Sequence, residues 1–248
     1  MLKIPHLGLI SLCAFAATLA AADQPVSVVI RDIAVIDPAA TRWLTHRDIV
    51  IKDTTIASVV PTGGALPPAK TTIQGAGKFA IPGLFDNQIA LARFTRDTAG
   101  LLIANGITSV RDIGTDAERI AEWRRDIAYG RFMGPRIVAT CADCGGPRQD
   151  GAANARHEEL ARLVSESGVT PAAALRRATV DSAALLGRSK DLGSIEAGKI
   201  ADLVILTGDP LADIHHTVSI DAVIFRGEAL TRAHLNVLKS RAAATAGK

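Results

Sequence analysis

The sequence predicts a mixed α/β fold in which two β-rich segments flank an α/β centre. Residues 26–80 contain β-branched runs such as VSVVIRDIAVID, with partial alternation of apolar and polar positions. Residues 81–190 instead alternate short apolar strands with helical stretches, as βα units do. β-Rich sequence returns from Leu192 onward. We therefore expect the two distant β segments to form one sheet domain, from which the α/β segment extends as an insertion.

Length and composition allow one or two packed domains. The chain has 248 residues, of which 48% are hydrophobic, so it is long enough to bury a sizeable core. The formal net charge is +3, and no stretch is dense in Lys and Arg. We therefore expect no nucleic-acid partner and no binding to an anionic membrane surface.

Residues 1–22 have the pattern of a signal peptide. Lys3 supplies a positive start, Leu7–Leu19 is apolar, and Ala20–Ala22 gives a small-residue cleavage site before Asp23. The apolar run is short for a membrane span, which needs about 20 residues. We expect a mature chain without a stable membrane span, in a bacterial periplasm or secreted. An uncleaved anchor is the alternative.

The central segment contains clear strand and helix patterns. GITSVRDIG, from Gly106 to Gly114, is typical of a short buried strand after a turn. DAERIAEWRRDIAYG follows as an amphipathic helix, because Ile120, Trp123 and Ile127 recur at helical spacing before Gly130. GPRIVAT then predicts another strand.

Helices are predicted again after the polar, glycine-rich loop Cys141–Arg156. HEELARLVSES is helical. Thr170 and Pro171 provide an N-cap and a first-turn proline for one continuous helix that closes at Gly187. The end of the chain, from Thr231 to Lys248, is also predicted to be helical.

Loss of residues 1–22 leaves two cysteines, Cys141 and Cys144, in the sequence CADC. In an oxidising compartment they are candidates for a short-loop disulfide, with two free thiols as the alternative. A zinc site would need about two further ligands. His157 or the pair His215-His216 would supply them only if the fold brought them close.

Five blocks resemble successive segments of the amidohydrolase superfamily, in its imidazolonepropionase-like and prolidase-like branch. They are IPGLFDNQIA, NGITSVRDIGT, GPRI, HEELARLVSESGVTPAAALRRATVDSAALLG and LGSIEAGKIADLVIL with the following GDPLADI. The resemblance covers nearly all of the mature chain, and the last block is the most specific. It implies a composite β-sandwich from residues 23–80 and 191–232, an incomplete (β/α)8 TIM-type barrel over 81–190, and a helical tail over 233–248.

The resemblance also implies a chemistry. Members of this family hydrolyse carbon–nitrogen bonds in non-peptide and dipeptide amides with one or two divalent metals, usually zinc. The metal lowers the pKa of a bound water and polarises the scissile carbonyl. Its ligands include an H-x-H pair on the first strand, often a carboxylated lysine, two later histidines and an aspartate.

This sequence departs from the ligand pattern. The H-x-H positions carry Gln88 and Ala90; glutamine is a poor zinc ligand and alanine is none. Asp86 matches the aspartate of the first-strand motif and is a weak metal candidate, with a turn hydrogen bond as the alternative. The family's lysine and later histidines would fall in the loop Cys141–Arg156, which has neither residue type. Asp150 in that loop is the candidate for the catalytic aspartate, with a turn role as the alternative.

Other polar residues of the resembling blocks are given structural roles. We expect Arg111 and Asp112 to pair with each other or to cap a neighbouring helix, and Asp202 to fix the turn before a buried strand. His215 and His216 are expected in a surface turn.

Two functions remain open. One is a hydrolase of carbon–nitrogen bonds by descent, impaired in this chain because the zinc ligands are missing, so that no zinc is expected to bind. The other is a non-catalytic structural or interaction remnant. The predicted βα units leave open sheet edges, which the sheet domain, a partner or self-association must cover. A partner chain that completed the barrel would restore the first function.

Overall fold

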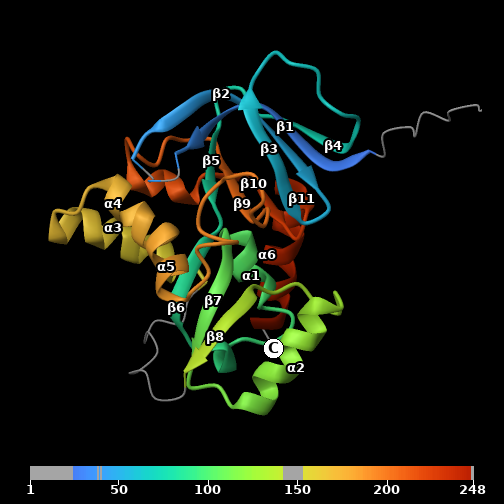
Figure 1. Ribbon diagram of the computed structural model, residues 1–248. Helices are drawn as coiled ribbons and strands as arrows, with labels where there is room; N and C mark the ends of the chain where they lie inside the picture. The colour runs from blue at the N-terminus through green and yellow to red at the C-terminus, as the bar shows by residue number, and fades with distance from the viewer. Residues whose placement is uncertain (1–24, 38, 40, 142–152, 247–248) are drawn as a thin grey trace, which may run out of the picture.

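The computed structural model describes residues 25–37, 39, 41–141 and 153–246 (Figure 1). Within them the predicted mixed α/β fold is confirmed. The β-rich parts from both ends of the chain meet in one eight-stranded sheet of order β11-β10-β9-β5-β1-β2-β3, with β4 paired to β1. Its strands are β1 (Val26–Ile36), β2 (Trp43–Lys52), β3 (Thr55–Pro61), β4 (Ala69–Gln74), β5 (Phe79–Pro82), β9 (Leu203–Leu206), β10 (Ile220–Phe225) and β11 (Glu228–Thr231).

β5 is the strand that joins the two ends. It lies parallel to β1 on one side and antiparallel to β9 on the other, with Phe79 opposite Leu206 and Pro82 opposite Leu203. Buried β-branched and aliphatic side chains from both ends pack together across this sheet, among them Ile30, Ile49 and Ile205. The predicted meeting of the two β segments is therefore observed.

A second sheet of three parallel strands follows directly from β5. Its order is β6-β7-β8, with β6 (Leu84–Ile89), β7 (Ile107–Ile113) and β8 (Arg136–Cys141). Two short elements, η1 (Leu91–Arg93) and α1 (Gly100–Ala104), link β6 to β7, and α2 (Ala117–Ala128) links β7 to β8.

α2 forms as the sequence predicts. Asp116 caps its first turn by accepting a hydrogen bond of 2.8 Å from the backbone N–H of Arg119. Ile120, Trp123 and Ile127 are buried and belong to the large apolar core between the sheets and the helices. This amphipathic stripe fixes which face of α2 meets the sheet.

The predicted helix 170–187 is wrong as one continuous element. It divides into α4 (Pro171–Arg177) and α5 (Val180–Leu185), although the Thr170 cap is present. The carbonyl of Ala178 accepts the N–H of Phe85 on β6 at 2.8 Å, and Thr179 Oγ1 donates to the carbonyl of Leu175 at 2.9 Å. These contacts divert the backbone from helical pairing, and α5 then packs on β6 through Ala183 and Phe85.

The remaining helices flank the two sheets in Figure 1. α3 (Ala155–Ser167) and the short η2 (Ile214–Val218) lie together, and the predicted tail helix is α6 (Arg232–Ala246). α6 packs on α1, where Leu238 fills the space that the absent side chain of Gly100 leaves. Among the helices of the described residues, none is long and apolar enough to cross a membrane.

Asp202 connects the two sheets, which is more than the local turn role predicted for it. Its carboxylate is 3.2 Å from Nη2 of Arg136 at the start of β8, and its carbonyl accepts the N–H of Gly83 between β5 and β6. Burial raises the pKa of the Asp202 carboxyl above its ordinary value, while Arg136 limits the rise. This ion pair ties the start of β8 to the beginning of β9.

The β10–β11 hairpin requires glycine in its turn. Arg226 and Gly227 form a two-residue turn with φ of 56° and 78°, as in the type I′ turns of hairpins. A Cβ atom on Gly227 would lie 1.6 Å from the carbonyl oxygen of Asp53. The turn therefore packs directly on the backbone between β2 and β3.

His157 joins three elements inside the core. Its ring Nε2 donates to the carbonyl of Asn105 at 2.9 Å, and Nδ1 lies 3.0 Å from Oγ1 of Thr217 in η2. Burial lowers the pKa of His157 from 6.5 to about 4, although the Asn105 hydrogen bond opposes the shift. The neutral ring thus holds α3 against η2 and the end of α1.

Gly227→Ala is expected to lower the free energy of unfolding by about 3 kcal/mol or more, because the positive φ and the Asp53 carbonyl both oppose the new methyl. Gly130→Ala is the matched control. Gly130 also has a positive φ, of 69°, but a Cβ there meets nothing within 4 Å. We expect that variant to lose about 1 kcal/mol. Urea unfolding followed by far-UV circular dichroism compares them, and equal losses would contradict the steric account.

Acid should weaken the fold through His157. The unfolded chain binds a proton at this residue near pH 6.5, whereas the folded chain does so only near pH 4. The stability that neutral His157 provides is complete above pH 6.5 and is lost as the pH falls toward 4, by up to about 3 kcal/mol.

Urea unfolding across this pH interval tests the His157 prediction. His157→Gln should flatten the pH dependence of the free energy of unfolding relative to the unsubstituted chain. His215→Gln changes an exposed histidine and should leave that dependence in place. A His157→Gln variant whose pH dependence matched the unsubstituted chain would contradict the prediction.

Candidate active site at the carboxyl ends of the parallel strands

The carboxyl end of β6 is the natural place to look for a site, because βα folds bind their ligands at the carboxyl ends of parallel strands. Asp86 lies in the middle of β6, three residues before its end, and is only 4% exposed. Its Oδ1 accepts the backbone N–H of Gln88 at 3.0 Å, a turn-type hydrogen bond of the kind expected as the alternative to a metal role.

Gln88 and Ala90, at the two H-x-H positions, have different surroundings. The side chain of Gln88 is exposed to solvent, whereas Ala90 is 8% exposed and starts the 3-10 turn η1. The site therefore has one neutral amide and one buried methyl group where the resemblance implies two imidazoles.

The expected roles of Arg111 and Asp112 are confirmed for Asp112 and need correction for Arg111. Arg111 Nε donates to the carbonyl of Asn87 at 2.8 Å. Asp112 is fully buried; its Oδ1 accepts the N–H of Leu91 at 2.8 Å and the hydroxyl of Thr115 at 2.7 Å. Asp112 therefore caps the neighbouring 3-10 helix η1, which is one of the two expected roles, whereas Arg111 binds the backbone of β6 and is not paired with Asp112 in these contacts.

Two polar residues at this end were not singled out from the sequence. Asn87 donates through Nδ2 to Ser182 Oγ on α5 at 2.8 Å, which ties the strand end to the covering helix. Asn87 Oδ1 and Ser109 Oγ are buried without a hydrogen-bond partner. Neither Asn87 nor Ser109 belongs to a recognisable catalytic motif, so the sequence alone gives no reason to select them.

The candidate catalytic aspartate and one of the two cysteines lie outside the part of the chain that the structure describes. Asp150 and Cys144 fall outside the described residues. Cys141, the last residue of β8, is disulfide-bonded.

The histidines of the described carboxyl-terminal half do not converge on this site. His157 is engaged with Thr217 and Asn105 as described above. His215 pairs with Asp213 at 2.8 Å on the surface, as expected, and His216 bonds the carbonyl of Asp209 at 3.0 Å. In the part of the chain that the structure describes, no three His, Cys, Asp or Glu side chains gather so as to hold a metal ion.

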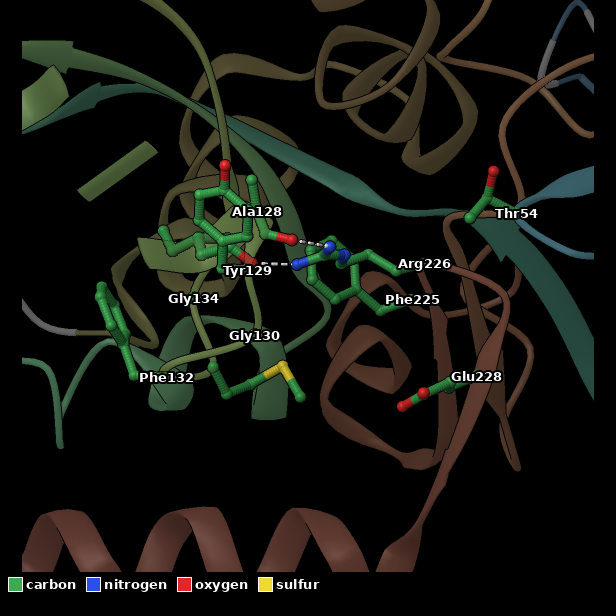
Figure 2. A pocket seen from close by; sticks show the side chains of 11 residues that line it. Thr54, Ala128, Tyr129, Gly130, Phe132, Gly134, Phe225, Arg226 and Glu228 are labelled. Atoms are coloured by element: carbon green, nitrogen blue, oxygen red, sulfur yellow. Dashed lines mark hydrogen bonds between the residues drawn. The ribbon is translucent and has the colours of Figure 1, made fainter. Parts of the chain in front are cut away.

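A cavity of about 410 Å³ lies elsewhere, between the end of α2 and the β10–β11 hairpin. Figure 2 shows Arg226 directed at the end of α2, where its guanidinium donates to the carbonyls of Ile127 and Ala128. Because α2 ends near the start of β8, this cavity is at the opposite end of the parallel sheet from the carboxyl ends of β6 and β7. Its side chains include Thr54, Tyr129, Phe132, Met133, Phe225, Arg226 and Glu228.

Several solved structures with a similar fold are named as hydrolases. A Bifidobacterium longum protein assigned as a prolidase has a TM-score of 0.73 and 17% identity, over 87% of this chain and 98% of its own. Phenylurea hydrolase B has a TM-score of 0.72 and 14% identity, over 85% and 98%. A Xaa-Pro dipeptidase with bound methionine in its active site has a TM-score of 0.64 and 15% identity, over 82% and 99%.

Sequence comparison gives a family match over part of the chain. No curated protein sequence matches the chain. The profile of the amidohydrolase family matches residues 146–230, which contain the GSIEAGKIADLVIL block. This match over residues 146–230 and the shared fold both support the resemblance to the amidohydrolase superfamily.

Proposed function

We propose that this chain keeps the framework of an amidohydrolase and, as a single chain, does not hydrolyse carbon–nitrogen bonds. In this proposal residues 23–80 and 191–232 form a β-sandwich and residues 81–190 an incomplete TIM-type barrel. The chain then acts as a structural or interaction module of the family.

The proposal rests on the residues that occupy the two H-x-H positions, at the end of β6 and just after it. Metal-dependent amide hydrolysis needs a cation that makes hydroxide from water near neutral pH. At the family's two histidine positions, exposed Gln88 and buried Ala90 supply no ligand suited to zinc. One buried carboxylate, Asp86, does not replace a set of three or four ligands.

The other described residues do not fit a zinc centre either. The amidohydrolase family is generally metal-dependent. Here, however, Asp112 is hydrogen-bonded to Leu91 and Thr115, and His157 is buried between Thr217 and Asn105. The polar groups that could ligate a metal are used to hold the fold, so no catalytic step through zinc is derived for this chain.

A hydrolase of carbon–nitrogen bonds is the second candidate function. The names of the similar structures favour it, since they include a prolidase and a phenylurea hydrolase. For this chain to be active, Asp150 and a partner chain would have to supply the missing ligands and the missing part of the barrel.

The metal content of the purified chain separates the two functions. We expect less than about one tenth of a zinc ion per chain, and no amidase or dipeptidase turnover that a chelator abolishes, because a tight structural or catalytic zinc site takes three or four protein ligands. Elemental analysis by plasma mass spectrometry and a chelator-sensitive assay on dipeptide and urea-type amides provide the two measurements.

Asp86→Asn and Asp97→Asn form a matched pair for that experiment. Both remove one carboxylate, but Asp86 is buried within β6, whereas Asp97 is exposed in the following loop. Stoichiometric zinc that Asp86→Asn removes and Asp97→Asn retains, together with chelator-sensitive turnover, would overturn the proposal in favour of an active hydrolase.

We also propose that the chain is exported, to a periplasm or beyond, after cleavage between Ala22 and Asp23. The support is the sequence pattern of residues 1–22. Fractionation of the producing cells with amino-terminal sequencing should give an exported protein that begins at Asp23. Leu12→Arg places a charge in the apolar run and should keep the chain inside the cell. An exported chain that still began at Met1 would contradict the cleavage.

A further inference from the structure

β8 lies at the margin of the parallel sheet, beside α2 (Figure 1). In the part of the chain that the structure describes, β7 is the strand paired with it, and no strand lies on its other side. Val138 and Ala139 are half-buried and Thr140 is exposed. The strand carries no proline or lysine, which are the usual means of blocking such an edge.

We propose that this margin is an interface that takes a second copy of this chain. β8 pairs antiparallel with β8 of the partner subunit about a twofold axis perpendicular to the sheet. Strand addition at an open edge is a general mode of association, and a twofold contact requires a surface that complements itself. The inference goes beyond the proposed function and does not depend on it.

The twofold arrangement also determines how the α2 helices of the two subunits are placed relative to each other. α2 links two neighbouring parallel strands, so it runs antiparallel to β8 on one face of the sheet. Rotation about an axis perpendicular to the sheet keeps that face. The two copies of α2 therefore lie on the same side of the extended sheet and antiparallel to each other.

The charges on α2 complement themselves in this arrangement. Glu118 is in the first turn and Arg125 is two turns later, and both are exposed on the same side of the helix as Ala121. In an antiparallel pair centred near Ala121, Glu118 faces Arg125 of the partner subunit, and the reverse contact repeats it. The small side chain of Ala121 permits a close approach at the centre.

One contact already connects α2 to this margin. Arg124 Nε donates to the carbonyl of Ile137 at 3.2 Å. It covers the beginning of β8, so the strand pairing is centred further along, on Ala139. The same contact fixes the position of α2 relative to the edge that the partner meets.

Reversing the charges of Glu118 and Arg125, singly and together, tests the interface. Sedimentation velocity of the purified chain over a concentration series should show a monomer–dimer equilibrium. Glu118→Arg and Arg125→Glu should each weaken dimerisation about tenfold or more, since each turns two symmetric attractive contacts into repulsive ones. The combined substitution reverses both charges and should restore the affinity of the unsubstituted chain.

Two further variants complete the test. Glu166→Arg makes the same charge change on exposed α3 and should leave dimerisation unchanged. Thr140→Lys places a charge on the exposed edge and should weaken dimerisation. Far-UV circular dichroism verifies that each variant is folded. A chain that stays monomeric at every concentration, or a combined variant that fails to recover, would overturn the proposal, as would equal effects of Glu118→Arg and Glu166→Arg.

Discussion

The pairing of β5 with β9 is the constraint on which the rest of the structure depends. It places Phe79 opposite Leu206 and so joins strands from the two ends of the chain in one sheet. β5 also continues almost directly into β6, across Gly83, whose N–H is bound by the carbonyl of Asp202. The position of the parallel sheet is therefore set by a contact between residues that are more than a hundred positions apart in the sequence.

Polar groups at the candidate site hold backbone segments in place. β6 and β7 end where a βα fold presents its reactive groups. At that place the carboxylate of Asp112 binds Leu91 and Thr115, and the guanidinium of Arg111 binds the carbonyl of Asn87. These groups hold backbone segments in place, and satisfied buried polar groups of this kind stabilise a fold without any metal.

Local pattern and family resemblance predicted much of this structure. Helical spacing located α2, because the spacing of Ile120, Trp123 and Ile127 alone determines which face is buried. The division between α4 and α5 could not be read in this way, since it depends on the N–H of Phe85, which is distant in sequence. The burial of His157 likewise depends on Asn105 and Thr217, and no local signal reports such partners.

We propose that the carboxyl ends of β6 and β7 do not hold zinc. The most direct measurement is an anomalous-scattering map, recorded at the zinc absorption edge from crystals grown with excess zinc. The account predicts no ordered zinc peak within bonding distance of Asp86 or Gln88. A strong peak there, with three or more protein ligands around it, would contradict the account.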